Sequence, residues 1–397
     1  MIAGILILGA PPYVSAKTFA DAYTGKFLSS KTDGKIWYVS QKDKKRYPID
    51  GFGDLERFKS EFKEIPYLDF QKIVPETICV EADKTAAKMY EGNILRFKDE
   101  LWFVSPKSKK RALLKEGETG AIKEIALAAD LKTISLIHKK DLSESLDRYS
   151  RYDQKTFKVN NRSVKAEVIE IDLGNPNMKI ITDTANGSTC KSGCSSRDMI
   201  DYVIPNKAFA GVNGSYFCSG SGCSNINYYF SPIYRSNTKV LINSDQLKYW
   251  TTGPIMAFDE NNKFYYFKDS REFGGVENFE KKYNVKLQAA LSNKPRLIEG
   301  GMNYLIDWEL DKGQATSRAT RNAIGYKDNK IYLVVSYSTT VPELGEIMQK
   351  MGMEYALNLD GGSSSAFFYN DEFMVGPGRK IPNVILFAQK NSTVALK

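Results

Sequence analysis

The sequence contains a single histidine, His138, and this scarcity excludes several kinds of active site. A Ser-His-Asp triad and a histidine-rich zinc site both need histidine beside the reacting groups. Downstream of His138, acid–base chemistry therefore depends on carboxylates, tyrosine, lysine or water. His138 itself is interpreted as a helix-end or surface residue.

Long hydrophobic runs are also missing. The apolar run at 2–10 is too short to span a bilayer as a helix. Pro11 and Pro12 follow it, and 14–16 looks like a small-residue cleavage site, so we predict a secretory signal peptide at 1–16. The alternative, a buried N-terminal strand, is disfavoured by the two prolines. We therefore expect a secreted or cell-surface protein with no transmembrane span in the mature chain.

Cysteines are few, with five in 397 residues, and Cys79 stands apart from the rest. The other four cluster, and their spacings do not match a zinc ribbon. In an exported protein they predict disulfides, either local or crossed between the two pairs, and we favour local pairing. Cys79 is then left as a buried free thiol. The disulfide candidates are Cys190, Cys194, Cys218 and Cys223.

The net charge of +9 raises the question of an anionic partner. The basic residues are spread among acidic ones without a long basic run, so nucleic acid is not the predicted partner. We favour a soluble basic protein, and attraction to an anionic cell-wall polymer stays open. The 42% hydrophobic fraction suffices for sizeable cores, and the 23 Tyr and 21 Phe suit both β-rich structure and sugar contact.

The segment 17–145 contains an internal repeat. A strand beginning near Trp37, followed by a basic turn, recurs near Trp102. Each copy predicts a β-hairpin followed by a helix, at 55–62 and at 121–131. The copies resemble small Trp-Tyr-Val repeats of bacterial surface proteins. We interpret both tryptophans as core residues, and a second hypothesis gives a wall-targeting role to the basic turns. These turns contain Lys44, Lys45, Arg46, Lys109, Lys110 and Arg111.

Beyond a predicted linker at 146–160, residues 161–392 mix strands and helices without βαβ regularity. This order predicts an α+β fold, a mixed-sheet catalytic domain preceded by the two small β-rich repeats. A short helix is expected at 197–203. A longer one is expected from a capping box at Thr340 to about Met351, with Gly352 ending it.

The chain is organised around one stretch, Asn358-Leu359-Asp360-Gly361-Gly362-Ser363-Ser364, at the end of a predicted buried strand. Paired glycines permit unusual backbone angles and let N–H groups approach an anion. Asp360 beside such a loop is a candidate catalytic carboxylate. The local pattern alone favours a hairpin turn at Asp-Gly, and only the wider context favours a site.

That context is a set of four blocks in one order. They resemble the phosphodiester glycosidase family, whose members act on sugar–phosphate diesters such as those of N-acetylglucosamine 1-phosphate. The resemblance spans roughly 160–390. Ser363 and Ser215 stand where the family typically has glycine. The blocks are Gly211–Phe217, Lys294–Ile298, Arg321–Gly325 and Asn358–Ser364.

The resemblance implies cleavage of the C1–O bond of a sugar-1-phosphodiester, in which phosphate leaves readily and strong acid catalysis is not needed. Asp360 is the expected base, nucleophile or metal ligand. Arg321 and Arg296 are the phosphate candidates, with structural salt bridges as their alternative. Asn213 and Asn358 are candidate sugar contacts, with strand-end capping as their alternative. Gly361, Gly362 and Ser364 complete the expected cradle.

The implied partner is a phosphorylated glycan or wall polymer. No cofactor is required, and a divalent cation is compatible with the pattern. Two other functions stay open: a non-catalytic surface protein of the same fold that binds anionic glycan, and an enzyme that splits P–O in place of C–O.

Overall fold

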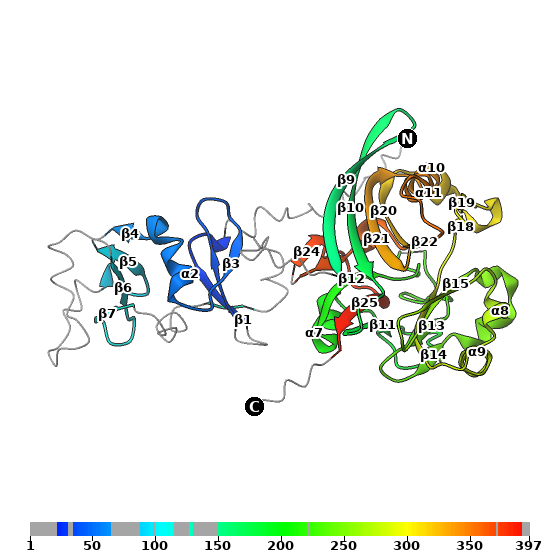
Figure 1. Cartoon of the computed structure of the whole chain (residues 1–397), viewed down its shortest axis with the longest axis horizontal. Helices are drawn as coiled ribbons and strands as arrows, with labels where there is room; N and C mark the ends of the chain where they lie inside the picture. The colour runs from blue at the N-terminus through cyan, green and yellow to red at the C-terminus, as the bar shows by residue number, and fades with distance from the viewer. Residues whose placement is uncertain are drawn as a thin grey trace, which may run out of the picture. The chain divides into compact units, whose positions relative to one another are not determined.

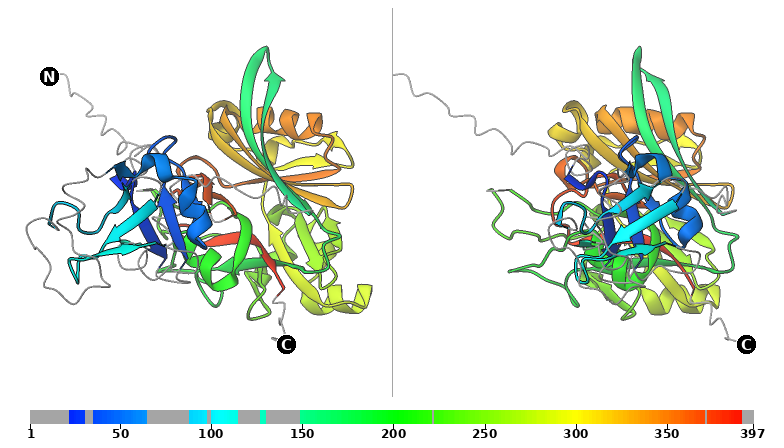
Figure 2. Two further views of the ribbon diagram at one scale, coloured as in Figure 1. Left: turned by 60° about the vertical axis from the view of Figure 1, so that its left-hand side comes forward. Right: turned by 90° about the vertical axis from the view of Figure 1, so that its left-hand side faces the viewer.

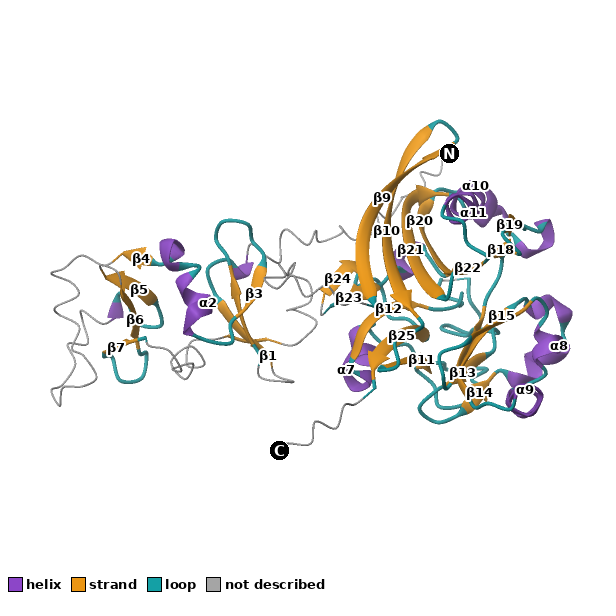
Figure 3. Ribbon diagram, viewed as in Figure 1, coloured by secondary structure: helices purple, strands orange, loops and turns teal. Residues whose placement is uncertain are grey.

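The computed structural model describes residues 22–30, 35–64, 88–97, 100–114, 127–129, 149–220, 222–370 and 372–390. The chain divides into two compact units, 1–144 and 145–397. The signal-peptide prediction, the Cys79 thiol and the position of His138 all fall outside the described residues. The fold is α+β, as expected, with strands predominating (Figure 3).

The N-terminal unit contains two antiparallel hairpin sheets, each completed by a strand that follows the other hairpin. The segment after the first hairpin supplies β4, which joins β5 in parallel. The segment after the second supplies β8, which joins β1 in parallel. Residues 127–129 are therefore strand, and the helix expected at 121–131 is wrong there. The strands are β1 (Phe27–Ser30), β2 (Ile36–Val39), β3 (Arg46–Pro48), β4 (Lys63–Glu64), β5 (Ile94–Phe97), β6 (Glu100–Val104), β7 (Arg111–Leu113) and β8 (Leu127–Ala129).

The helix expected at 55–62 is divided into α2 (Phe52–Glu56) and the 3-10 turn η1 (Lys59–Glu61). Trp37 is buried, in agreement with its interpretation as a core residue, whereas Trp102 is only partly buried. The Arg46 side chain is fully buried, and its guanidinium carbon lies 4.3 Å from the Trp37 ring centroid. Arg111 lies over Trp102 in the same way, at 5.4 Å. These arginines therefore contribute to packing by cation–π contact, which argues against a wall-binding role for Arg46.

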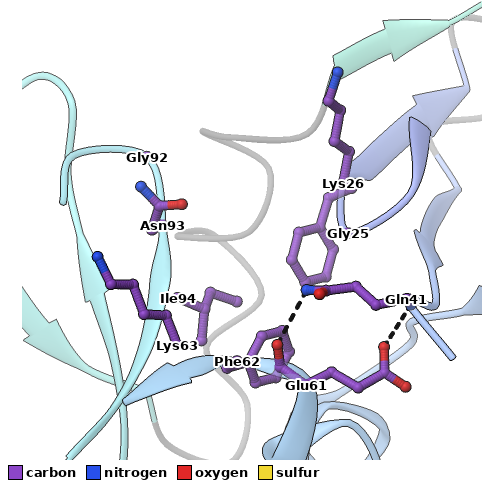
Figure 4. Close-up of a pocket in the computed structure, with 10 residues that line it drawn as sticks. Gly25, Lys26, Gln41, Glu61, Phe62, Lys63, Gly92, Asn93 and Ile94 are labelled. Atoms are coloured by element: carbon purple, nitrogen blue, oxygen red, sulfur yellow. Dashed lines mark hydrogen bonds between the residues drawn. The ribbon is translucent and has the colours of Figure 1, made fainter. Parts of the chain in front are cut away.

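A pocket of about 510 Å³ lies in the N-terminal unit, lined by residues of both hairpins (Figure 4). Its one lining carboxylate, Glu61, accepts hydrogen bonds from the Ser40 hydroxyl at 2.8 Å and the Gln41 amide at 2.6 Å. The Tyr38 hydroxyl donates to the same carboxylate at 3.2 Å. Glu61 is thus occupied in holding the first hairpin to η1.

The C-terminal unit consists of three sheets, whose pairings are antiparallel throughout the described residues. The largest has seven strands in the order β19-β18-β22-β20-β21-β10-β9. The others have five strands each, in the orders β11-β25-β12-β23-β24 and β14-β13-β17-β15-β16. The first sheet consists of β9 (Ser150–Val159), β10 (Arg162–Asp172), β18 (Arg296–Glu299), β19 (Met302–Asn303), β20 (Ala319–Lys327), β21 (Lys330–Thr339) and β22 (Tyr355–Leu359). The second consists of β11 (Met178–Thr184), β12 (Ala208–Asn213), β23 (Phe367–Tyr369), β24 (Glu372–Val375) and β25 (Asn383–Gln389). The third consists of β13 (Ile233–Arg235), β14 (Val240–Ile242), β15 (Ile255–Asp259), β16 (Phe264–Phe267) and β17 (Leu287–Ser292).

One hydrophobic core joins the three sheets. It includes Leu357 and Leu359 of β22, Val212 of β12 and Met256 of β15. Burying an aliphatic side chain contributes about 1.5–3 kcal/mol, so this shared core is what holds the strand ends of different sheets together.

The opposite face of the seven-stranded sheet is covered by α11 (Val341–Lys350) (Figure 1). This helix begins at the predicted capping box: the Thr340 hydroxyl accepts from the Glu343 amide, and the Glu343 carboxylate accepts from the Thr340 amide. Gly352, at φ +76°, follows the helix end. Val341, Leu344 and Met348 pack on the sheet from one helix face.

The other described helices of the C-terminal unit are α7 (Ile200–Asn206), α8 (Ser270–Phe273), α9 (Val276–Tyr283) and α10 (Lys312–Thr316). Its 3-10 turns are η2 (Ser244–Lys248), η3 (Trp250–Thr252), η4 (Asp307–Glu309) and η5 (Gly362–Ser364).

Two boundaries differ from the sequence predictions. Residues 150–159, predicted as linker, form β9, which pairs with β10 in a hairpin that extends beyond the rest of its sheet (Figure 2). The short helix expected at 197–203 begins later, because Arg197 pairs with Ile381 in an isolated β-bridge and α7 starts at Ile200.

Candidate active site

The site is built where β12 and β22, strands of two different sheets, come to their ends. The Asp360 amide donates to the Gly214 carbonyl at 2.9 Å, and the Asn213 amide donates to the Ala366 carbonyl at 3.2 Å. The shared core beneath brings the two strand ends together. Two sequence blocks that lie far apart in the chain, those of Asn213 and Asp360, therefore form one structure.

The backbone carbonyl of Asp360 is held by two buried asparagines. Asn213 Nδ2 donates to it at 2.7 Å and Asn322 Nδ2 at 2.8 Å. Asn322 also donates to Asn213 Oδ1 at 2.7 Å, and that oxygen accepts from the Ala366 amide at 3.1 Å. The polar groups of the Asn213 side chain are thus engaged within the protein. The structure favours the strand-end role of Asn213 over the sugar contact.

The Asp360 carboxyl is 6% exposed and lies beside the loop that follows β22. Oδ1 accepts from the Gly361 amide at 2.9 Å, and Oδ2 has no hydrogen-bond partner among the described residues. Burial raises the pKa of Asp360 to about 6, although the Ser364 hydroxyl, Arg379, the Gly361 amide and Arg321 each lower it. The carboxylate therefore has one free oxygen and is ionised above about pH 6.

The paired glycines have different roles. A side chain on Gly361 would place its Cβ 2.5 Å from the Thr320 carbonyl oxygen, so the loop can approach β20 only with glycine there. Gly362 has φ +62°, and open space surrounds the position a Cβ would take. The backbone of Ser363 does not have a positive φ. Serine therefore fits without backbone strain at the position of the family's third glycine.

Two arginines act on the charge of Asp360, and one of them, Arg379, is not among the residues expected from the sequence. Arg321 Nη2 donates to the Ser317 carbonyl at 2.7 Å and to the Gly313 carbonyl at 3.2 Å. Arg379 Nε donates to the Ser364 hydroxyl at 2.8 Å. Both arginines lower the pKa of Asp360, which places two positive charges near its carboxylate.

Arg296 lies in a different environment. Nε and Nη2 contact Glu309 Oε1 at 3.1 and 2.8 Å, and Nη1 contacts Glu299 Oε2 at 2.9 Å. Two carboxylates thus engage all three guanidinium nitrogens, and the salt-bridge alternative describes this residue. The guanidinium is held by Glu309 and Glu299, so the expected phosphate contact of Arg296 is corrected to a structural ion pair.

Tyr216 and Asn358 are the remaining members of the Asp360 group. Asn358 Nδ2 donates to the Tyr216 hydroxyl at 2.7 Å, and Asn358 Oδ1 is buried without a hydrogen-bond partner. The pKa of Tyr216 is raised by burial and by the Asp360 charge, against lowering contributions from Asn358, Arg321 and Gln314. The charges of Asp360 and Arg321 therefore act on the Tyr216 hydroxyl in opposite directions. An unsatisfied buried amide oxygen favours a ligand that donates a hydrogen bond.

The disulfides are local, as favoured: Cys190–Cys194 and Cys218–Cys223. The second loop begins directly after Phe217, whose ring lies 4.9 Å from the Arg379 guanidinium carbon. Asn227, within the same stretch of chain, donates to the Cys194 carbonyl at 3.0 Å and so links the two loops. The bridges stiffen the segment that supplies Tyr216 and Phe217.

In the described ranges, no group of three or more His, Cys, Asp or Glu side chains is placed to hold a metal ion. No helix among the residues that the structure covers is both long and apolar enough to cross a bilayer.

Sequence reasoning missed three residues of this group. Tyr216 was within a recognised block but was not singled out. Arg379 follows Gly376-Pro377-Gly378, a turn signal that could have been noticed, and the Gly378 turn packs against the carbonyls of 363–365. Asn322, next to Arg321, faces inward and gave no pattern of its own.

The family model described as phosphodiester glycosidase matches residues 206–388, which confirms the resemblance over that stretch. It contains all four sequence blocks and every residue of the Asp360 group. No curated protein matches the sequence.

Solved structures align with this chain at low identity. A hypothetical protein from Synechocystis is 12% identical with a TM-score of 0.47, covering 60% of this chain and 62% of that one. The chain thus spans less than two thirds of that protein. The zebrafish N-acetylglucosamine-1-phosphodiester alpha-N-acetylglucosaminidase catalytic domain, auto-inhibited by its pro-peptide, is 16% identical with a TM-score of 0.46, covering 60% and 83%. A putative exported protein from Burkholderia pseudomallei is 12% identical with a TM-score of 0.35, covering 57% and 74%.

Proposed function

We propose that this protein is a secreted hydrolase of the phosphodiester glycosidase type, which cleaves the bond between C1 of a sugar and a phosphodiester oxygen. The observation that carries the proposal is the buried Asp360 carboxylate, whose Oδ2 has no hydrogen-bond partner among the described residues and whose pKa is lowered by the positive charges of Arg379 and Arg321. This arrangement lies within the residues that match the family model. A carboxylate for the sugar carbon and cations for the phosphate are what the reaction needs.

In the proposed reaction, water attacks C1 as the C1–O bond breaks. The electron pair of that bond goes to the phosphate oxygen, which leaves as a phosphate monoester. Asp360 Oδ2 accepts the proton from water, and the sugar leaves with a hydroxyl group at C1. Arg321 and Arg379 stabilise the phosphate charge. A phosphate monoester is a weak base, so the site works without a strong general acid.

The substrate class follows from the unpaired acceptor. Asn358 Oδ1 is buried and needs a donor, which a sugar hydroxyl or an acetamido N–H supplies. Tyr216 already accepts from Asn358, so its own hydroxyl hydrogen is available to the ligand. These contacts suit an N-acetylglucosamine 1-phosphodiester. Two disulfides and the predicted signal peptide suit an extracellular polymer as the natural source of that linkage.

The test is incubation with the methyl diester of N-acetylglucosamine α-1-phosphate in ¹⁸O-labelled water. Release of free sugar, with methyl phosphate free of label, is the expected result, because C1–O cleavage puts the water oxygen on the sugar. Label in the phosphate would mean P–O cleavage and would overturn the glycosidase proposal. Binding of the diester without any product would identify a non-catalytic glycan-binding protein.

A further inference from the structure

A cluster of aromatic side chains lies next to the Asp360 group and has no part in the proposed bond cleavage. Trp250 is 53% exposed and Trp308 is 42% exposed, and their ring centroids are 4.8 Å apart in an edge-on contact. Phe230 lies nearby, since Lys294 Nζ is 5.1 Å from its ring and 5.6 Å from the Trp308 ring. Phe230, Trp250 and Trp308 around Lys294 are called the aromatic patch below. Exposed clustered tryptophans are uncommon on a protein surface unless they bind something.

The aromatic patch is joined to the site through Asn293, the residue before Lys294. Asn293 Nδ2 donates to the Asn358 carbonyl at 2.7 Å, and its Oδ1 accepts from the Tyr216 amide at 3.3 Å. Neighbouring Cα atoms are about 3.8 Å apart, so the patch starts one residue from two members of the Asp360 group. A ligand of several units could contact both.

The patch is also held rigidly. Lys294 Nζ donates to the Thr251 carbonyl at 3.2 Å, which fixes the turn that carries Trp250. The turn that carries Trp308 is fixed by Glu309, whose carboxylate accepts from the Arg296 amide at 2.9 Å and from its guanidinium. This gives Arg296 a positioning role in place of the phosphate contact expected from sequence. Rings fixed before binding lose little conformational entropy when a ligand stacks on them.

From these contacts we infer that the aromatic patch binds further sugar units of a phosphorylated glycan beside the cleaved linkage, while Lys294 contacts the phosphate between units. The inference rests on the proposed function for its choice of ligand. Tryptophan faces stack on the apolar faces of sugar rings, and an ammonium among them selects a glycan that carries negative charge. A neutral apolar partner would not need the cation, and an acidic peptide would not need flat rings.

The test compares two probes of different length on the Asp360→Asn variant, which prevents turnover. The short probe is the methyl diester of N-acetylglucosamine α-1-phosphate, and the long probe is a trimer of N-acetylglucosamine joined by 1→6 phosphodiesters. Binding is measured by calorimetry. Adding Trp308→Ala or Trp250→Ala is expected to weaken trimer binding about tenfold and to leave the methyl diester unchanged. Trp308→Phe, which keeps a ring, should retain most of the trimer affinity.

Two further variants sharpen the result. Lys294→Gln should weaken trimer binding and flatten its dependence on salt, since a screened charge contact is removed. Val240→Ala, at an exposed apolar residue of β14, is the matched control and should change neither probe. Trimer affinity that is unaltered in both tryptophan variants, or a trimer that does not bind at all, would overturn the inference.

Failure of this inference is distinguishable from failure of the proposed function. Hydrolysis of the methyl diester by the wild type, without any tryptophan dependence of trimer binding, would leave the glycosidase proposal standing and remove the patch from it. If trimer binding depends on the tryptophans but the wild type releases no sugar, the aromatic patch stands as a glycan-binding surface and the glycosidase proposal falls.

Discussion

The side-chain amide of Asn213 donates a 2.7 Å hydrogen bond to the backbone carbonyl of Asp360, across 147 residues of sequence. Its Oδ1 accepts from the Asn322 side chain and from the Ala366 amide, so both polar atoms of the Asn213 side chain have partners. We therefore expect Asn213→Ala to lower the free energy of unfolding by about 1–3 kcal/mol, because buried partners lose their hydrogen bonds. Urea unfolding measures this change.

Asn213 and Asn322 donate to the same carbonyl, that of Asp360. The double variant Asn213→Ala, Asn322→Ala should therefore lose less stability than the two single variants added together. Simple additivity would mean that the two asparagines act separately.

Asp360→Asn should reduce sugar release by at least about a thousandfold, because the variant has no carboxylate to accept a proton. The fold should survive. The native pKa of Asp360 is raised to about 6 from an ordinary value of 3.8, so ionisation at neutral pH works against folding. Removing that charge is expected to stabilise the protein at pH 7, by up to about 3 kcal/mol, and the gain should vanish below pH 4. Calorimetric melting at the two pH values, beside a product assay, checks both statements. Asp328→Asn, at an exposed carboxylate, is the control.

The pH dependence of kcat/KM should show an acidic limb near pH 6. Asp360 must be ionised to act as a base, and its pKa is about 6, so the rate should fall tenfold per pH unit below that value. Stopped assays over pH 4–8 with the methyl diester measure the limb. A flat profile across this range would remove Asp360 as the base.

Arg379→Gln should lower kcat/KM by about ten- to a thousandfold, since one phosphate-stabilising charge is lost. It should also move the acidic limb of the pH profile to higher pH, because Arg379 lowers the pKa of Asp360 and its removal raises that pKa. The pH profile of the variant separates these effects from a general loss of structure. Arg271→Gln serves as the control, since this exposed arginine pairs only with Asp269 among the described residues. An unshifted limb would mean that Arg379 does not face the carboxylate.

Arg296→Met should destabilise the protein by about 3–5 kcal/mol, because the Glu309 carboxylate is left buried and unpaired. Replacing Glu309 by leucine in the same chain should restore much of this loss, since no buried charge remains. Urea unfolding of the single and double variants measures the difference. A single variant of wild-type stability with lost phosphate binding would reinstate the role expected from sequence.

Much of the architecture was within reach of the sequence because it depends on local chemistry. The capping box at Thr340 and Glu343 predicted the start of α11. The local disulfide pairing that we favoured from the sequence is the pairing that forms. The order of four motifs identified the family resemblance that the match at 206–388 confirms.

The predictions that failed concern tertiary partners. Residues 150–159 look like a charged linker, yet they form an edge strand because β10 offers a free edge. Residues 127–129 carry a helical pattern, but β1 captures them as a parallel strand.

The sequence by itself determined that a carboxylate would follow a buried strand beside paired glycines, since those properties belong to neighbouring residues. Only the tertiary structure decided which arginine accompanies it. The sequence favoured Arg296, which lies in one of the four blocks, over Arg379, which lies in none. Packing leaves the first between Glu309 and Glu299 and the second beside Ser364 and the Asp360 loop. A guanidinium charge acts over a few ångströms, so its role follows from the residues that folding places around it.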